Sequence, residues 1–181
     1  MLTFITGNAN KFAEAKAILG ELEQLDINLP EIQSLDSREI IKAKLQEALK
    51  HHAGHFIVED TSLSLECLKG LPGPLIKWFL ETVGSDGLSE IAIRADNQKA
   101  RAAVTIGYAS SPDSIHFFEG SVAGTIVAPR GDSKFGWDVI FQPEGHERAY
   151  GEMQKEEKNQ ISPRRLALDG LRAFLEKNET A

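Results

Sequence analysis

Apolar runs and segments of helical period alternate along the first third of the chain. Residues 2–6 form an apolar, β-branched run that ends at Gly7 and Asn8, which predicts a strand entering a turn. The period then changes, because apolar residues share one helical face up to Gly20, where we expect the helix to end. The same two patterns next predict a strand at 25–29, a helix at about 38–51 and a strand at 55–58.

The rest of the chain adds helices and then a run of strands. A loop rich in Gly and Pro at 70–74 separates it from the first part. The elements expected after this loop are a helix through Trp78 and Phe79, a helix at 87–94, strands at 102–108 and 115–127, and a last helix that follows Ser162 and has Pro163 at its first position. This order predicts an α/β fold with a mixed sheet. We expect one continuous domain over residues 1–181, with two lobes and a cleft between them.

Composition and charge narrow the class of protein. The 181 residues are 41% hydrophobic and 26% charged, as in ordinary globular proteins. The net charge of −7 argues against a nucleic-acid partner, because such proteins hold phosphates with clustered Lys and Arg. It does not argue against a small phosphate ligand, which needs only a few cations. Cys67 is the single cysteine, so an intramolecular disulfide is excluded. With no secretory signal and no apolar run of about 20 residues, we expect a cytoplasmic protein without a membrane partner.

The turn between the first strand and the first helix has features of an anion site. Backbone N–H groups and the helix dipole favour an anion at a helix start. Gly7 removes a side chain from the turn, Asn8 can donate from its amide, and Lys11 adds a positive charge. A triphosphate would fit, although the spacing is not that of a P-loop. Ordinary turn chemistry with a solvated lysine stays open as the alternative.

Two adjacent carboxylates, Glu59 and Asp60, follow the strand at 55–58, which we expect to stop at residues 59–61. Neighbouring side chains of a strand point to opposite faces, so at least one of the two acids faces a cleft or solvent. Mg²⁺ prefers one or two carboxylates together with phosphate oxygens and water. Asp60 is therefore a candidate to hold the metal, to orient the attacking water, or both. The alternative is a turn with solvated acids.

The segment from Phe135 to Asp138 is a candidate base pocket. Two aromatic rings, at Phe135 and Trp137, flank Gly136 and can enclose a planar base, while Asp138 can accept hydrogen bonds from its edge. The alternative is a structural turn with both rings in the core. Three cations, Lys158, Arg164 and Arg165, also lie around the start of the last helix. The positive end of the helix dipole repels them unless an anion or a base carbonyl lies nearby. The alternative is that they are ordinary solvated charges.

Motifs along nearly the whole chain follow one another in the order typical of one enzyme family. The matching stretches are Thr6-Gly7-Asn8-Ala9-Asn10-Lys11, Leu29-Pro30-Glu31, Val58-Glu59-Asp60-Thr61, Gly70-Leu71-Pro72-Gly73-Pro74 with Ile76-Lys77-Trp78-Phe79, Ile126-Val127-Ala128-Pro129-Arg130-Gly131, Phe135-Gly136-Trp137-Asp138, and Glu157-Lys158-Asn159 with Ser162. The chain therefore resembles the inosine triphosphate pyrophosphatase family. The resemblance implies a long central mixed sheet, flanked by helices in two lobes with an active-site cleft between them, and a homodimer. It also implies Mg²⁺-dependent hydrolysis of ITP, dITP and XTP to the monophosphate and pyrophosphate, which cleanses the nucleotide pool.

The resemblance also assigns roles to individual residues. Glu31 and Asp60 would bind Mg²⁺, Glu59 would add to the metal shell, and Asp60 would act as general base beside the catalytic residues Lys11 and Glu31. The residues implied to contact the substrate are Thr6, Gly7, Asn8, Ala9, Asn10, Lys11, Lys44, Thr61, Phe135, Gly136, Trp137, Asp138, Lys158, Ser162 and Arg164.

One position departs from the family pattern. The family normally has His-Arg after the serine, and both residues help to read the six-position carbonyl of the purine. This chain has Pro163 before Arg164, and proline has no donor in its side chain or backbone. We expect the fold to tolerate the proline and the base selectivity to change. Three other functions stay open: a related pyrophosphatase with broadened base selectivity, a nucleotide-binding sensor that has lost catalysis, and a plain interaction domain. Retention of Glu31 and Asp60 argues against the sensor.

Overall fold

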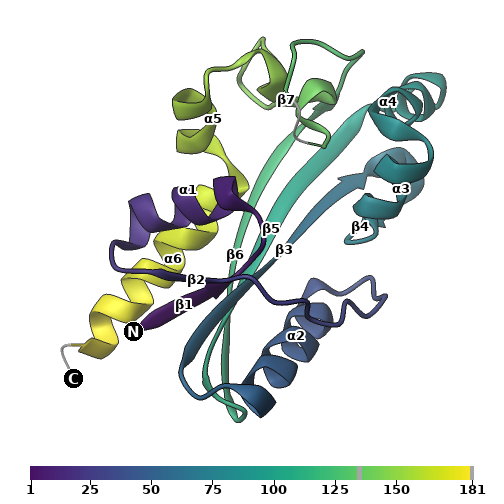
Figure 1. The fold of residues 1–181 in the computed structure, drawn as a ribbon. Helices are drawn as coiled ribbons and strands as arrows, with labels where there is room; N and C mark the ends of the chain where they lie inside the picture. The colour runs from purple at the N-terminus through teal and green to yellow at the C-terminus, as the bar shows by residue number, and fades with distance from the viewer. Residues whose placement is uncertain (134–135, 180–181) are drawn as a thin grey trace. The chain divides into compact units, whose positions relative to one another are not determined.

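The computed structural model describes residues 1–133 and 136–179. Within them the chain forms six α-helices and seven strands (Figure 1). In chain order these are β1 (Leu2–Ile5), α1 (Ala9–Leu19), β2 (Glu23–Leu25), α2 (Ser37–His51), β3 (His55–Leu65), β4 (Pro72–Gly73), α3 (Ile76–Thr82), α4 (Gly84–Arg94), β5 (Lys99–Ser111), β6 (Ser114–Ile126), β7 (Phe141–Pro143), α5 (Lys155–Ile161) and α6 (Pro163–Glu179). In this part of the chain, no helix combines the length and the hydropathy needed to span a bilayer.

The strands form one mixed sheet in the order β2-β1-β3-β5-β6-β7, with β4 paired to β3. Strand β1 runs parallel to both β2 and β3, whereas β4 is antiparallel to β3 and β7 is antiparallel to β6. The expected α/β fold with a mixed sheet is therefore confirmed.

Contacts within the chain divide it into two compact units. Unit 1 comprises Met1–Asp60, Val104–Gly120 and the residues from Arg164 onwards, and unit 2 comprises Thr61–Ala103 and Ser121–Pro163. Strands β3, β5 and β6 each contribute residues to both units.

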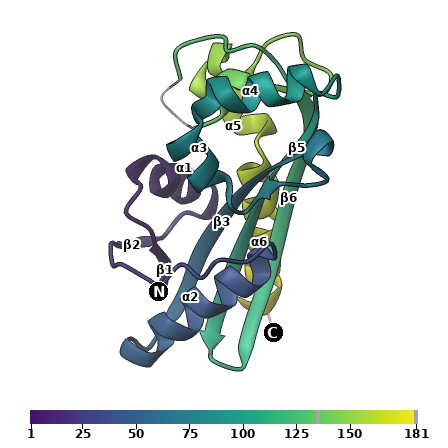
Figure 2. The same cartoon turned by 90° about the vertical axis from the view of Figure 1, so that its right-hand side faces the viewer.

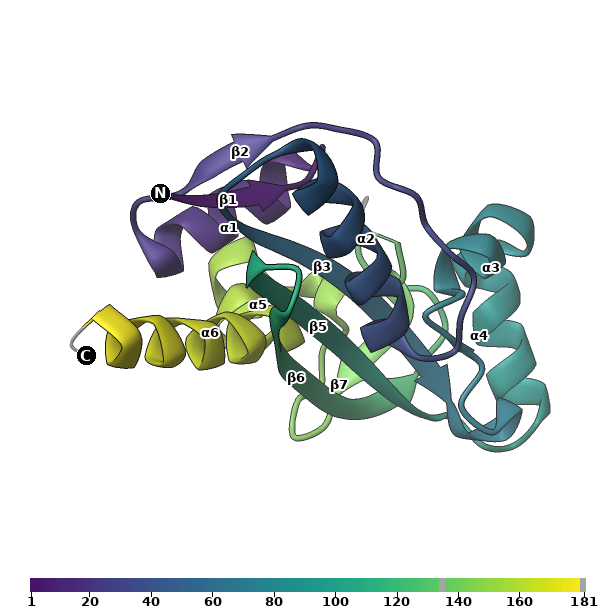
Figure 3. The ribbon, with the colours of Figure 1, turned by 90° about the horizontal axis from the view of Figure 1, so that it is seen from below.

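Unit 1 has a hydrophobic cluster on each face of its strands, because successive strand residues point to opposite sides. Phe4 and Ile57 pack with residues of α1 and α6, while Ile5 and Val58 pack with residues of α2. Figure 3 shows α2 on one side of β1 and β3 and α6 on the other. Helix α2 lies very close to β5: a Cβ added to Gly107 would stand 2.1 Å from Ile41 Cγ2. The absence of a side chain at Gly107 thus lets α2 settle onto the sheet.

Unit 2 has its own core. Leu63 and Leu65 of β3 pack with Leu88 of α4 and with the aromatic rings of Trp137 and Phe141. Helices α3 and α4 follow one another and lie side by side (Figure 2). This core draws on segments up to Tyr150 in the sequence, so it depends on long-range contacts.

Three predicted strands have other bounds in the structure, and one of them, expected at 102–108, is β5 at Lys99–Ser111. Strand β3 does not stop at residues 59–61 but runs on to Leu65, because Leu63 and Leu65 are buried in alternation with half-buried polar residues. Glu59 and Asp60 therefore lie within a strand. The strand expected at 25–29 is β2 at Glu23–Leu25, since its parallel partner β1 ends at Ile5. Helices α1, α2, α3, α4 and α6 lie close to their predicted positions, and α5 was not anticipated.

Candidate active site

The turn before α1 is fixed by its own side chains. Asn8 caps the helix, because its Oδ1 accepts from the backbone N–H groups of Asn10 and Lys11 at 3.0 and 3.1 Å. Thr6 Oγ1 accepts from the N–H of Asn8 at 3.1 Å. A side chain at Gly7 would meet Asp26, whose Oδ1 would stand 2.8 Å from the added Cβ. The backbone N–H groups of Asn8, Asn10 and Lys11 thus donate to side chains within the turn. Phosphate binding by residues 6–11 stays a prediction. Its support is the charge of Lys11, the helix dipole and the exposure of residues 7–10.

An ion cluster in the interior of unit 1 consists of Lys11, Glu14, Glu59 and Arg164. Glu59 accepts from Arg164 with both carboxylate oxygens, at 2.7 Å from Nε to Oε2 and 3.0 Å from Nη2 to Oε1. Lys11 Nζ lies 2.9 Å from Oε1 of Glu59. Arg164 also donates from Nη1 to Oε2 of Glu14 at 2.8 Å. The side chain of Glu59 is 2% exposed, so this carboxylate is held by two cations in the interior.

The charges of the cluster stabilise one another. Burial alone would raise the pKa of Glu59, but the charges and hydrogen bonds of Lys11 and Arg164 hold it well below its usual range. Burial would likewise lower the pKa of Arg164, whereas Glu59 and Glu14 raise it above its ordinary value. Both oxygens of Glu59 are occupied by guanidinium and ammonium groups. This geometry argues against the expected place of Glu59 in a metal shell and favours a structural role.

The neighbouring carboxylate, Asp60, has a different environment. Ser37 Oγ donates to Asp60 Oδ2 at 2.6 Å. Burial raises the pKa of Asp60 above its ordinary value, although the Ser37 hydrogen bond and the charges of Lys44 and Lys11 oppose the rise. A carboxylate with a raised pKa is a stronger proton acceptor, which suits a general base.

Glu31 and Lys44 form a further ion pair in unit 1. Lys44 Nζ lies 2.7 Å from Glu31 Oε1, and the Lys44 side chain is 11% exposed against 53% for Glu31. Among the described residues, no group of three acidic, His or Cys side chains could hold a metal ion. Mg²⁺ does not require such a group, because it takes one or two carboxylates and completes its shell with phosphate oxygens and water. The carboxylates of Glu31 and Asp60 fit that donor set.

The other predicted site residues gather in unit 2. Asp138 is buried and accepts from Ser133 Oγ at 2.9 Å and from Lys158 Nζ. Lys158 Nζ also lies 5.5 Å from the centre of the Tyr150 ring. Burial, assisted by the charge of Asp138, raises the pKa of Tyr150. Ser162 is buried at the end of α5, with its Oγ 3.5 Å from the carbonyl oxygen of Asn159.

The aromatic base pocket is only partly described. Phe135 lies outside the described residues. Trp137 is 5% exposed and packs in the core of unit 2, which favours the structural alternative for this ring. Gly136 has a φ of 41°, a conformation that glycine adopts readily. Contacts of Gly136 and Trp137 with a base stay predictions.

Sequence reasoning missed Glu14, Ser37 and Ser133. Glu14 carried a local signal, because it is a charged residue next to the apolar stripe of α1 and three residues after Lys11. Ser37 and Ser133 carried none, since the partner of Ser37 lies 23 residues away and Ser133 precedes its motif in a loop.

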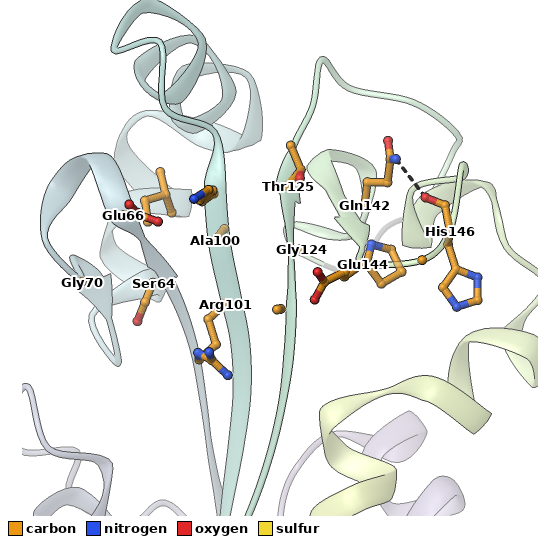
Figure 4. Close-up of a pocket in the computed structure, with 15 residues that line it drawn as sticks. Ser64, Glu66, Gly70, Ala100, Arg101, Gly124, Thr125, Gln142, Glu144 and His146 are labelled. Carbon is orange, nitrogen blue, oxygen red and sulfur yellow. Dashed lines mark hydrogen bonds between the residues drawn. The ribbon is translucent and has the colours of Figure 1, made fainter.

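A separate pocket of about 680 Å³ lies in unit 2 along β3, β5, β6 and β7 (Figure 4). Its lining has both signs of charge, including Glu66, Arg101 and Glu144, and all three residues are exposed. No residue assigned to the active site from the sequence is among those that line it. The pocket is therefore distinct from the candidate site.

Comparison with known proteins matches the chain, including the predicted site residues of both units, to one family. Residues 2–174 match the sequence model of the Ham1 family. The inosine triphosphate pyrophosphatase of Schizosaccharomyces pombe is 45% identical over 179 residues, which cover 97% of this chain and 95% of that protein. The protein of the same name from Pyricularia oryzae is 43% identical over 182 residues, with coverages of 98% and 95%.

The solved structures with a similar fold also include Ham1 proteins. A HAM1 protein from Coxiella burnetii matches with a TM-score of 0.84 at 26% identity and covers 98% of this chain and 100% of its own. The Staphylococcus aureus Ham1 protein matches with a TM-score of 0.79 at 25% identity and the same coverages.

The ion cluster generates a prediction about stability. Replacing Arg164 by Met leaves Glu59 and Glu14 buried without their shared partner, so the free energy of unfolding in urea should fall by about 3–5 kcal/mol. The matched control is Arg172→Met, because Arg172 lies on the same helix but is 44% exposed; it should change the value by at most about 0.5 kcal/mol.

The effect of Arg164→Met should depend on pH. Because Glu59 has a lowered pKa in the folded protein, its contribution to stability is present above its ordinary value of 4.5 and is lost as the pH falls below it. The difference between wild type and variant should therefore be largest near neutral pH and narrow in acid. Equal stability of the two proteins at neutral pH would contradict this account of the cluster.

Proposed function

Because the chain belongs to the Ham1 family, we propose that it hydrolyses deaminated, noncanonical purine nucleoside triphosphates such as ITP, dITP and XTP to the monophosphate and pyrophosphate. Such an activity removes damaged nucleotides from the precursor pool. The observation that carries the proposal is the Asp60 carboxylate, whose pKa is raised by burial and which shares unit 1 with the cations Lys11 and Lys44. A group that accepts a proton, beside groups that bind phosphate, is what anhydride hydrolysis by water requires.

Asp60 acts as the general base. It takes a proton from water as the water oxygen bonds to phosphorus, and the bond from phosphorus to the bridging oxygen breaks so that pyrophosphate leaves. The negative charge that develops on pyrophosphate is stabilised by Lys11, by Lys44 and by the N-terminus of α1. The ion pairs of Lys11 with Glu59 and of Lys44 with Glu31 keep both ammonium groups in place before substrate arrives.

Asp60 and Glu31 would hold the Mg²⁺ that the family resemblance implies. When bound, the ion would neutralise part of the charge on the phosphate chain and on the leaving pyrophosphate. In this proposal Glu59 is not a ligand of the Mg²⁺ ion, because its carboxylate is bound by Lys11 and Arg164 in the ion cluster.

The residues of unit 2 bind the nucleoside. Lys158, held by Asp138, supplies a cationic donor suited to the six-position carbonyl of a deaminated purine. The amino group of adenine would instead leave that donor without an acceptor, which disfavours ATP. Phe135 and Gly136 are further nucleoside contacts in our proposal, whereas the ring of Trp137 packs in the core of unit 2. A homodimer and a cytoplasmic location, both expected from the sequence, stay predictions.

The function is tested by measuring the release of pyrophosphate from ITP, dITP, XTP, GTP and ATP, with Mg²⁺ and with EDTA. We expect release from the first three, one monophosphate formed per pyrophosphate, and no release in EDTA. Release of inorganic phosphate, or release that EDTA leaves undiminished, would contradict the proposed reaction. Binding of ITP without any hydrolysis would identify a nucleotide-binding sensor instead.

Pro163 favours a second, related function, which is the same hydrolysis with broadened base selectivity. Pro163 is the first residue of α6 and is buried, so it offers the base no donor where the family has His. Because a missing hydrogen bond to a buried group corresponds to about 1–3 kcal/mol, Pro163→His should raise the ratio of kcat/KM for ITP to that for ATP by roughly 5-fold to 150-fold.

The matched control for this substitution is Pro112→His, because Pro112 is an exposed turn residue. It should leave the ratio unchanged. A folded Pro163→His variant with the wild-type ratio would show that base selectivity does not depend on a donor at position 163.

A further inference from the structure

Asp60 is held by a residue outside all of the sequence motifs. The hydroxyl of Ser37 donates to Oδ2 of Asp60 at 2.6 Å, across 23 residues of sequence. Within the described part of the chain, this is the only hydrogen bond that the Asp60 carboxylate receives. The carboxylate therefore has one oxygen engaged by a neutral donor, and its Oδ1 is left for another partner.

The position of Ser37 is fixed by the way α2 begins and packs. Ser37 is the first residue of α2, and Asp36 caps the helix by accepting from the backbone N–H of Arg38 at 2.8 Å. One and two turns later, Ile41 and Leu45 are fully buried against the sheet. A helix held at both its cap and its apolar face cannot move its first residue without disturbing the core.

The same helix also controls the charge around Asp60. Ser37 and Lys44 are seven residues apart, which is about two helical turns, so they lie on one side of α2. The ammonium group of Lys44 interacts electrostatically with the Asp60 carboxylate. Helix α2 thus contributes both an orienting hydroxyl and a cation to this carboxylate.

The contrast with Glu59 shows why a neutral donor matters. Both oxygens of Glu59 are bound by cations, which stabilise its charge and weaken it as a base. A single neutral hydroxyl fixes the orientation of a carboxylate by engaging one of its oxygens, and it leaves the other oxygen uncovered. The hydrogen bond from Ser37 therefore orients Asp60 and leaves Oδ1 available.

We propose that Ser37 is a positioning residue for Asp60: its hydroxyl holds Oδ2, so that Oδ1 faces the water that attacks the triphosphate. This inference rests on the proposed function. In the reaction, Oδ1 accepts the proton of the attacking water while the phosphorus–oxygen bond to pyrophosphate breaks. Ser37 itself exchanges no proton and touches no substrate.

The test compares Ser37→Ala, Ser37→Thr and the control Ser34→Ala in pyrophosphate release from ITP at saturating Mg²⁺. Without the hydroxyl the carboxylate can rotate, so Ser37→Ala should lower kcat roughly 10-fold and leave KM within about 2-fold. Ser37→Thr keeps the donor and should recover kcat to within about 3-fold of wild type. Ser34 lies three residues earlier and bonds to Glu39 instead, so Ser34→Ala should retain the wild-type kcat.

Thermal unfolding of each variant separates positioning from folding. We expect the Ala and Thr variants to unfold at similar temperatures while their kcat values differ. A wild-type kcat in Ser37→Ala, or a Thr variant as slow as the Ala variant, would overturn the inference and leave the proposed function intact. No pyrophosphate release by the wild-type protein would overturn the proposed function, and this inference with it.

Discussion

The buried ion cluster is the constraint on which the rest of unit 1 depends. Arg164 joins Glu59 and Glu14 across sequence separations of 105 and 150 residues, and so connects α6 with β3 and α1. Charges removed from water must be paired, because an unpaired ion in the interior is strongly destabilising. The start of α6, the first turns of α1 and the middle of β3 are therefore held in one arrangement. Lys11 joins the cluster from α1, so the turn at residues 6–11, which we propose binds phosphate, is positioned by the same contacts.

This constraint gives two adjacent carboxylates opposite properties. Neighbouring residues of a strand point to opposite faces, so Glu59 enters the ion cluster while Asp60 faces Ser37 of α2. The pKa of Glu59 is held down by cations, whereas burial raises the pKa of Asp60. Titratable groups whose pKa values are pushed apart are typical of catalytic sites. The strand thus places a structural acid and a candidate base side by side.

Local patterns in the sequence predicted what depends on neighbouring residues. The helical period located α2 and α6, and the Gly-Asn turn before α1 is where the strand pattern changed to a helical one. The sequence also singled out Asp60 and Asp138 through their motifs. It did not predict that β3 continues past Asp60, because polar residues in a half-buried strand look like a turn when its partners are unknown.

Contacts between side chains that are far apart in the sequence could not be predicted from local sequence patterns. Arg164 was expected to contact the base, but no spacing rule could assign it Glu59 and Glu14 as partners, since tertiary packing alone brings them together. Trp137 was a candidate for base stacking, yet its ring belongs to the core of unit 2. Ser37 had no motif at all, and only the docking of α2 onto the sheet brings its hydroxyl to Asp60.

The central claim is that Glu59 is structural and Asp60 catalytic, and it is tested most directly by comparing Glu59→Gln with Asp60→Asn. Both changes remove a negative charge and nearly preserve shape, so the two variants control for each other. For each variant, the free energy of unfolding in urea and kcat for ITP are measured together. The account predicts that Glu59→Gln loses about 3–5 kcal/mol of stability. It predicts that Asp60→Asn stays within about 1 kcal/mol of wild type but loses at least roughly 100-fold in kcat. A stable Glu59→Gln protein together with a fully active Asp60→Asn protein would contradict it.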